Sequence, residues 1–204
     1  MTVDEALARA WIAAVADSVR AEAQHLTDLD TAIGDGDHGV NLRRGFDAVT
    51  AALDTLQPGS AGDVLGKTGT TLLSKVGGAS GPLYGTVFRA LGKTLREGGT
   101  FAEGLQAALD GVRRLGKAEV GDKTMVDALA PAVAAYASAE SAPEAARAAA
   151  QAAKTGVAST VPLTARKGRA SYLGERSAGH PDPGATSTAL ILEALARVTA
   201  EASS

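Results

Sequence analysis

Three aspartates, a histidine and an asparagine stand among three glycines within residues 30–41. The glycines permit a tight backbone that can bring Asp30, Asp35 and Asp37 together. Converging carboxylates repel each other by about 4 kcal/mol per pair at a separation of ~4 Å and an effective dielectric constant of ~20, whereas a whole domain is stable by only ~5–15 kcal/mol. Such a cluster therefore needs a cation, and its hard oxygen ligands favour Mg²⁺ over Ca²⁺ or Mn²⁺ and argue against zinc.

The same stretch has a second interpretation, a polar turn between two helices. Asp-Gly pairs are common in turns, and Asp37 or Asn41 could cap the following helix. An EF-hand is excluded, because in the register that starts at Asp35 the required glycine is Val40 and the bidentate glutamate is Phe46. The stretch alone leaves the metal site and the turn both open.

The apolar residues predict an all-α fold. Hydrophobic residues make up 45% of the chain but aromatic residues only 3%, so the core must consist of Ala, Leu and Val, which suit closely packed helices. No clear linker divides residues 1–204, so we predict one domain. Pro58 and Gly59 are expected to end the second helix. Helical spacing between glycine and proline breaks predicts eight helices and no strand: residues 4–26, 41–56, 63–74, about 82–97, about 100–112, about 124–139, about 143–159 and about 185–200.

Composition also argues against several classes of function. Without cysteine, the chain has no disulfide, iron–sulfur cluster or thiol catalysis. A net charge of −3 and the lack of a basic block argue against a nucleic-acid partner. No apolar run approaches the ~20 residues of a membrane span, and Asp4 and Glu5 stand where a signal peptide would be basic. We therefore expect a cytoplasmic protein with no membrane partner.

A glycine-rich turn, residues 77–81, enters the fourth predicted helix, with Pro82 in the first turn of that helix. Backbone N–H groups at such a turn, with the helix dipole behind them, can bind phosphate without a lysine, and Ser80 adds a hydroxyl. The alternative is a flexible turn in which Ser80 caps the helix. Two imitations of a Walker A loop, residues 61–68 and 111–118, each lack a required residue and follow no hydrophobic strand.

Helical periodicity is lost between residues 161 and 184, where four cations and several glycines and prolines occur in an acidic chain. Loops longer than ~12–15 residues in a compact domain are usually functional or disordered. We predict that this segment is a lid over an anion, with a disordered surface loop as the alternative. Of the histidines, His38 could contact a phosphate or a metal-bound water, His25 is expected at the surface, and the role of His180 is left open.

Five motifs follow one another along the chain: D-x4-DGDHG-x-N-x-x-RG at 30–45, GGASGPLYG at 77–85, GKAE-x-GDKTM at 116–125, ARKGRASYLGERS at 165–177 and H-x-DPG at 180–184. Together they resemble the nucleotide-binding L subunit of dihydroxyacetone kinase. The length of the chain is similar to a free-standing subunit of that family rather than to the fused, ATP-dependent kinase. The resemblance implies a barrel of eight antiparallel helices with ADP or ATP bound at one end.

The resemblance also implies the roles of individual residues. Two Mg²⁺ ions would be held by Asp30, Asp35 and Asp37 and would bridge to the diphosphate of the nucleotide. A catalytic role is implied for Arg169, which would neutralise charge in the transition state, and for His38. The remaining contacts fall into three groups: His38, Asn41, Ala79 and Ser80 at the phosphates, Gly116 and Met125 near the adenine and ribose, and Arg169, Asp182 and Gly184 in the lid.

Free-standing members of this family keep ADP as a bound cofactor. They accept a phosphoryl group from a phosphohistidine protein of the phosphoenolpyruvate phosphotransferase system, and pass it to dihydroxyacetone on a separate K subunit. The resemblance therefore implies a phosphotransferase with these two protein partners. Other functions stay open: an L-type subunit that uses exchangeable ATP, one that serves another acceptor such as a fatty acid or a different sugar, or a regulatory module that senses nucleotide without turnover. The sequence also leaves the oligomeric state open.

Overall fold

Several of the helices begin at residues whose side chains cap them. The computed structural model describes residues 3–57 and 59–203. Thr100 and Glu103 form a capping box at the start of α5, and Ser141 caps α7 by accepting a hydrogen bond from the backbone N–H of Glu144. The elements in chain order are α1 (Glu5–Ile33), α2 (His38–Asp54), α3 (Ala61–Lys75), α4 (Ser80–Arg96), α5 (Phe101–Gly116), α6 (Val126–Ala137), α7 (Ala142–Thr160), the 3₁₀ helix η1 (Arg169–Ser177) and α8 (Pro183–Glu201).

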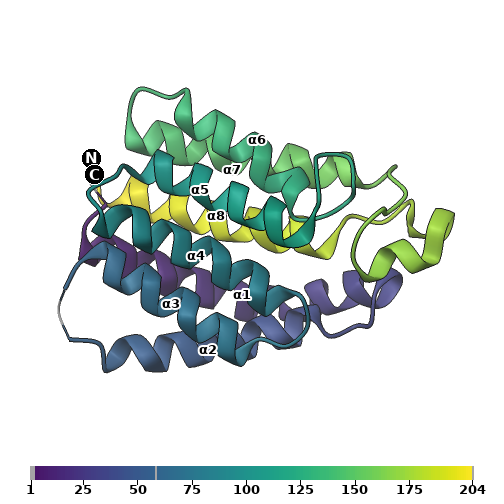
Figure 1. Cartoon of the computed structure of the whole chain (residues 1–204), viewed down its shortest axis with the longest axis horizontal. Helices are drawn as coiled ribbons and strands as arrows, with labels where there is room; N and C mark the ends of the chain where they lie inside the picture. The colour runs from purple at the N-terminus through teal and green to yellow at the C-terminus, as the bar shows by residue number, and fades with distance from the viewer. Residues whose placement is uncertain (1–2, 58, 204) are drawn as a thin grey trace.

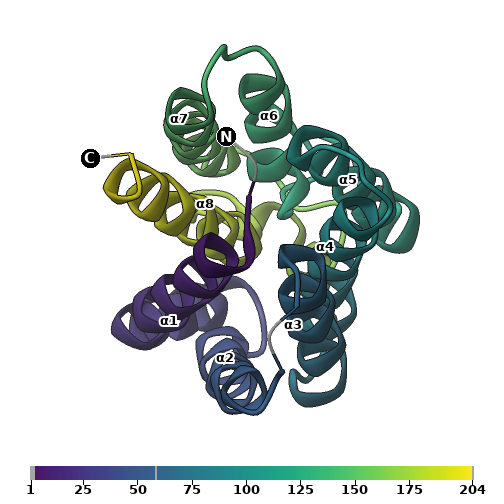
Figure 2. The ribbon, with the colours of Figure 1, turned by 90° about the vertical axis from the view of Figure 1, so that its left-hand side faces the viewer.

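The eight α-helices form a closed ring, seen end-on in Figure 2. Each helix packs against the next one in the sequence, and α8 packs against α1. The helices alternate in direction, so α1 begins and α8 ends at one end of the barrel while η1 lies at the other (Figure 1). The described residues contain no strand. The all-α, single-domain barrel expected from the sequence is thus confirmed.

Most of the few aromatic residues pack inside the barrel. Trp11 lies against Phe88 and Phe101, with ring centroids 5.5 and 5.7 Å apart, and its indole nitrogen donates a hydrogen bond to the backbone oxygen of Ile191 at 2.9 Å. This contact ties α1 to α8 where the ring closes. Elsewhere small residues let the helices approach closely: a Cβ at Gly92 on α4 would lie 2.5 Å from the backbone nitrogen of Gly66 on α3. No helix in the described part of the chain is both long and apolar enough to cross a membrane.

Two helix boundaries near the acidic stretch differ from the prediction. The first helix runs on to Ile33 instead of ending near residue 26, because the buried side chain of Ile33 anchors its last turn. The second begins at His38, so Asn41 is not its cap but a buried residue in its first turn. Asp30 therefore sits on the last turn of α1, which places it opposite the start of α2. Pro58, expected to help end the second helix, lies outside the described residues.

The segment 161–184 is more ordered than its composition indicated. It contains η1, and Ala165 and Ala170 pack with Ile33 in a small apolar cluster. Three glycines near this helix adopt positive φ angles, which favour glycine: Gly168, Gly174 and Gly179. This helix was not evident from the sequence because it is a short 3₁₀ type with a kink at Gly174, which helical periodicity does not reveal.

Candidate functional site

Three carboxylates meet where α1 ends and α2 begins. One ligand oxygen from each of Asp30, Asp35 and Asp37 lies within 4.8 Å of the others. Asp30 is held in place because its Oδ2 accepts hydrogen bonds from the backbone nitrogens of Asp37 and His38 at 2.8 and 3.1 Å. Within the described residues no hydrogen-bond donor reaches its other oxygen, Oδ1, which is therefore free to bind a ligand. An all-carboxylate set of this size fits a hard divalent cation such as Mg²⁺.

The turn at residues 77–79 faces this cluster from the start of α4. Gly78 has a φ angle of 64°, which a residue with a side chain rarely adopts. Ser80 is the first residue of α4, and the helix has no side-chain cap, so its first N–H groups are not occupied by one. Ser80 as a cap, the alternative considered above, is therefore wrong. Asn41 lies beside this turn, with its side-chain amide 3.5 Å from where a Cβ on Gly77 would be.

His38 links the acidic cluster to the turn. Its Nδ1 lies 3.1 Å from the hydroxyl oxygen of Ser80, and its Nε2 lies 2.8 Å from that of Ser187 on α8. Burial lowers the pKa of the imidazole, although the charges of Asp30 and Asp37 oppose that shift. The ring is thus a buried connection between α2, α4 and α8, and only its Ser80 side reaches the pocket.

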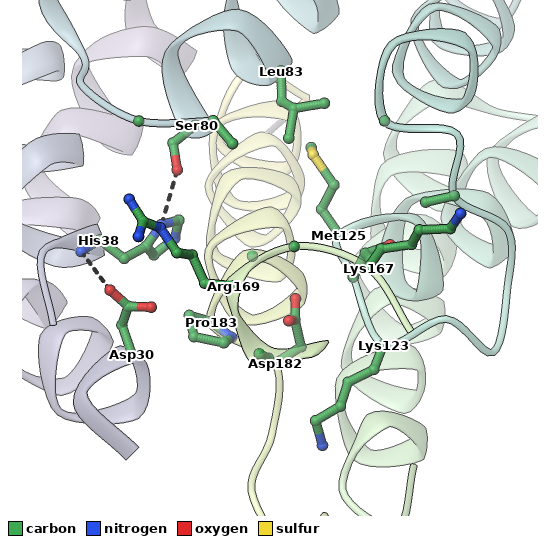
Figure 3. A pocket seen from close by; sticks show the side chains of 18 of the residues that line it. Asp30, His38, Ser80, Leu83, Lys123, Met125, Lys167, Arg169, Asp182 and Pro183 are labelled. Atoms are coloured by element: carbon green, nitrogen blue, oxygen red, sulfur yellow. Dashed lines mark hydrogen bonds between the residues drawn. The ribbon is translucent and has the colours of Figure 1, made fainter. Parts of the chain in front are cut away.

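A cavity of about 380 Å³ separates the cluster from the opposite wall of the barrel. In Figure 3, Asp30, His38 and Ser80 lie on one side, and Leu83 and Met125 lie together across the cavity. Its volume falls within the range of small-molecule sites, ~300–1,000 Å³. The polar side suits phosphates with their metal ions. The apolar side is completed by Val112, Ala118 and Val126 and suits a purine ring.

The segment 161–184 contacts the acidic cluster through an ion pair. A guanidinium nitrogen of Arg169, at the start of η1, lies 3.1 Å from Oδ2 of Asp35. The Arg169 side chain is 70% exposed, so this pair contributes little to stability by itself. Its position matters more, because Arg169 lines the same cavity as the carboxylates and Ser80 (Figure 3).

Lys123 is a functional candidate to which the sequence analysis assigned no role. It lies in the loop between α5 and α6, is buried, and donates hydrogen bonds of 2.6 Å to the backbone oxygens of Thr160 and His180. Burial lowers the pKa of its amine, while Asp182 and Asp127 oppose that shift. Lys123 thereby holds the backbone at His180 against the C-terminal end of α7. Because Lys123 follows Gly121 and Asp122, residues typical of turns, the sequence predicts that it is exposed. Its burial becomes evident only from the tertiary contacts.

Asp182 caps α8, with its Oδ2 accepting a hydrogen bond from the backbone nitrogen of Ala185 at 2.7 Å. Burial raises the pKa of this carboxyl to about 7. Since its ordinary value is 3.8, the folded protein holds the proton more tightly than the unfolded chain does. The stability that this proton confers is therefore complete below about pH 4 and is lost as the pH rises towards 7, at up to about 1.4 kcal/mol per pH unit.

Replacing Asp182 by asparagine should remove this contribution. The free energy of unfolding of Asp182→Asn should change less between pH 4.5 and pH 7 than that of the wild type. Urea denaturation at the two pH values measures the difference, with the surface variant Asp110→Asn as the control. An unchanged pH slope in Asp182→Asn would show that the Asp182 carboxyl ionises normally in the folded protein.

The structure brings nearly all the predicted site residues to one place. Asn41 is the exception, since it lies behind the glycine turn rather than on the cavity wall. The side chains of His25 and His180 are exposed and do not line the cavity. The predicted residues that do line it are Asp30, Asp35, Asp37, His38, Ala79, Ser80, Gly116, Met125, Arg169, Asp182 and Gly184.

Comparisons with known proteins agree with this geometry. A family model described as the DAK2 domain matches residues 32–197. The ADP-binding subunit DhaL of PEP-dependent dihydroxyacetone kinase 1 from Listeria innocua is 44% identical over 96% of this chain and 97% of its own length. The ADP-binding subunit DhaL of the PEP-dependent kinase from Escherichia coli is 46% identical over 94% of this chain and 95% of its own length.

A solved structure extends the comparison to the fold. The dihydroxyacetone kinase from C. freundii, in complex with AMP-PNP and Mg²⁺, matches 97% of this chain with a TM-score of 0.79 and 28% identity. The match covers 34% of that longer chain. From the family model, the two nearly full-length relatives and the shared barrel, the chain belongs to the DAK2 domain family of nucleotide-binding L subunits of dihydroxyacetone kinase.

Proposed function

We propose that this protein is the ADP-binding subunit of a phosphoenolpyruvate-dependent dihydroxyacetone kinase. The observation that carries the proposal is the carboxylate cluster, which faces a glycine turn at a helix N-terminus across one cavity. With divalent cations held by the carboxylates, this arrangement would neutralise and orient phosphate groups, and phosphoryl transfer requires little else from a protein. The nearly full-length relatives carry this function in their names.

Asp30, Asp35 and Asp37 would hold two Mg²⁺ ions. Bound Mg²⁺ would offset the charge of the diphosphate and of the phosphoryl group in transfer. In this proposal Asp30 is the fixed ligand, since two backbone N–H groups orient it, whereas Asp35 and Asp37 are exposed and can adjust. Arg169 would exchange its contact with Asp35 for one with a phosphate oxygen when the site is filled.

The remaining side chains would position the nucleotide. His38, Ala79 and Ser80 would meet the phosphates, with Asn41 supporting the turn from behind. The apolar side of the cavity, with Gly116 and Met125, would take the adenine and ribose. Asp182 and Gly184 would contact the nucleotide from the C-terminal end of the lid, residues 161–184. Lys123 holds the backbone of His180 in place beside them.

The exposed apolar residues support a role for protein partners. The described part of the chain has five large hydrophobic side chains that are exposed, and all five occur at the cavity end of the barrel: Val40, Leu73, Leu115, Val120 and Tyr172, the last of them 86% exposed. Apolar side chains gathered around a site commonly mark a protein interface. In the proposed function a K subunit that carries dihydroxyacetone and a phosphohistidine protein of the phosphotransferase system would dock here in turn.

The nucleotide that copurifies with the protein tests this function. We expect native mass spectrometry after gel filtration to show the chain with ADP and Mg²⁺ bound, and we expect EDTA to release the ADP, because the carboxylates alone would repel a diphosphate. A protein that exchanges ATP freely would instead support the second function, an L-type subunit that uses ATP directly. A protein that binds neither nucleotide in the presence of Mg²⁺ would contradict both.

The lid should respond to the nucleotide. We expect trypsin to cleave residues 161–184 more slowly with Mg-ADP than without it, because Arg169 would then be held by phosphate.

Arg169→Ala should lower turnover with the partner proteins by about 10³-fold or more while changing ADP affinity much less, as for other arginines that neutralise transition-state charge. Arg176→Ala, in the same segment but outside the cavity lining, is the matched control. Equal cleavage with and without Mg-ADP would count against a lid.

A further inference from the structure

A chain of buried hydrogen bonds runs from the core of the barrel to the phosphate turn. The hydroxyl oxygen of Tyr84 lies 2.6 Å from that of Ser187, which lies 2.8 Å from Nε2 of His38. On the other side of the ring, Nδ1 lies 3.1 Å from the hydroxyl oxygen of Ser80. Tyr84, Ser187 and His38 are buried, and Ser187 is the one member of the four that does not line the cavity. This series of hydrogen bonds joins α2, α4 and α8.

The hydrogen bonds in this series can all be donated in one of two directions, towards the cavity or away from it. In a neutral imidazole one ring nitrogen donates and the other accepts. If Nε2 donates to Ser187, then Nδ1 must accept the only hydroxyl hydrogen of Ser80. Ser80 would then present lone pairs to the cavity, and a phosphate oxygen, which only accepts hydrogen bonds, would be repelled. If Nδ1 donates to Ser80, the hydrogen of Ser80 is free for the phosphate.

The surroundings support the second direction. The Tyr84 hydroxyl is nearer to Ser187 than to its other neighbours, and it can donate to Ser187 because Thr188 already supplies the carbonyl of Gly184 with a donor at 2.8 Å. Ser187 can then give its own hydrogen to His38. Its competing acceptors are the carbonyl oxygens of Pro183 at 3.0 Å and Gly184 at 3.2 Å. The Pro183 carbonyl, in the first turn of α8, also faces the His38 ring and can accept the backbone N–H of Ser187, so it does not need the hydroxyl hydrogen.

We propose that Ser187 and Tyr84 are positioning residues, which act through His38 to keep the hydroxyl hydrogen of Ser80 directed at the nucleotide phosphate. This inference rests on the phosphate contact of Ser80 in the proposed function. Each hydroxyl and ring nitrogen donates one step towards the cavity: Tyr84 to Ser187, Ser187 to Nε2, and Nδ1 to Ser80. These buried hydroxyl groups thereby set the direction of the Ser80 hydroxyl, although Ser187 does not line the cavity itself.

The tautomer of His38 is directly measurable. In a ¹⁵N-histidine-labelled His25→Gln/His180→Gln protein, His38 is the only imidazole, and long-range ¹H–¹⁵N spectra distinguish its two nitrogens. With Mg-ADP we expect hydrogen on Nδ1. In the same background, Ser187→Ala should move the hydrogen to Nε2, which can then donate to the carbonyl of Pro183. A ring in the otherwise unaltered background protein that carries hydrogen on Nε2, or on both nitrogens, would overturn the proposal.

A double-mutant cycle separates positioning from a merely structural role. Ser187→Ala should weaken ADP binding about tenfold, comparable to losing one hydrogen bond to a charged group, and Tyr84→Phe should weaken it by a smaller factor. In a Ser80→Ala background, Ser187→Ala should have almost no further effect, because the group that it positions is absent. Effects that multiply in the double variant would overturn the proposal, since Ser187 would then act on the fold as a whole.

Thr199 on α8 provides the matched control. It is buried, and its hydroxyl bonds back to Leu195 at 2.7 Å, as Ser187 can bond back to Pro183, but in the described part of the chain it makes no hydrogen bond to His38. Thr199→Val should lower stability while leaving ADP affinity unchanged. A loss of affinity in Thr199→Val equal to that in Ser187→Ala would overturn the proposal. Wild-type ADP affinity in Ser80→Ala would contradict the phosphate contact itself and hence the proposed role of that residue.

Discussion

The purified chain, supplied with ATP, Mg²⁺ and dihydroxyacetone, is expected to make no detectable dihydroxyacetone phosphate. The cavity residues account for metal, phosphates and a purine, and the described residues offer no second group of side chains beside the phosphate position that would hold a small ketone. A larger hollow over α3, α4 and α5 is lined by cations such as Lys67, Arg89 and Arg114, but it shares no lining residue with the cavity. A ketone bound there would not be next to the phosphoryl group.

Turnover should appear only when a K-type subunit and a phosphohistidine donor are both added, and it should then reach the ~1–100 s⁻¹ of typical kinases. The donor and the acceptor need the same terminal phosphate position, so they should compete for the cavity end of the barrel. ADP should be recycled on the protein and not accumulate in solution. A coupled assay for product, run beside an assay for free ADP, checks both points. Steady turnover by the isolated chain, with one free ADP formed for each product, would refute the dependence on partners.

The second large effect is expected at the carboxylates. Asp35→Ala or Asp37→Ala should abolish Mg²⁺-dependent binding of ADP, with an affinity loss of about 100-fold or more, since even residues that only orient a metal ligand commonly cost 10–100-fold. Helix content should be unchanged, because both residues are exposed. Without metal the variants should be at least as stable as the wild type, because each removes like-charge repulsion from the cluster.

Calorimetric titration with Mg-ADP measures the affinity, and circular dichroism with thermal unfolding measures the fold. Asp28→Ala is the matched control, since Asp28 is an exposed acidic residue on the same helix as Asp30 that bonds only to Gln24 and does not line the cavity. It should bind Mg-ADP as the wild type does. Wild-type affinity in either Asp35→Ala or Asp37→Ala would refute the metal site.

Much of this architecture could be predicted from local sequence. The glycine and proline breaks separate eight apolar segments, and the capping residues Ser141 and Thr100 mark helix starts that the structure confirms. Helix formation depends on neighbours three and four residues apart, so these signals are readable in one sequence. The end of α1 was missed because Thr27, Asp28 and Thr31 are weak helix formers, and the buried contacts of Ile33 compensate for them.

The functional site could be predicted only in part from local sequence. The spacing of Asp30, Asp35 and Asp37 showed that they could converge, because only a few residues separate them and glycines turn the chain. The sequence did not indicate that the glycine turn at residues 77–81 would face the carboxylates. Residue spacing alone also could not decide whether residues 30–41 form a metal site or a plain turn. The five motifs in their order resolved that choice through resemblance to a family.

Contacts between residues far apart in sequence were decided by the tertiary structure. The closure of α8 against α1 brings Ser187 within 2.8 Å of His38, 149 residues away, and the return of the lid brings Arg169 within 3.1 Å of Asp35. Lys123 likewise becomes a buried clamp only because the ends of α7 and of the lid meet around it. Sequence fixes the local helices and the residue types that can bind metal and phosphate. Which of those residues meet depends on how the apolar faces pack around the whole ring, a property that no single segment contains.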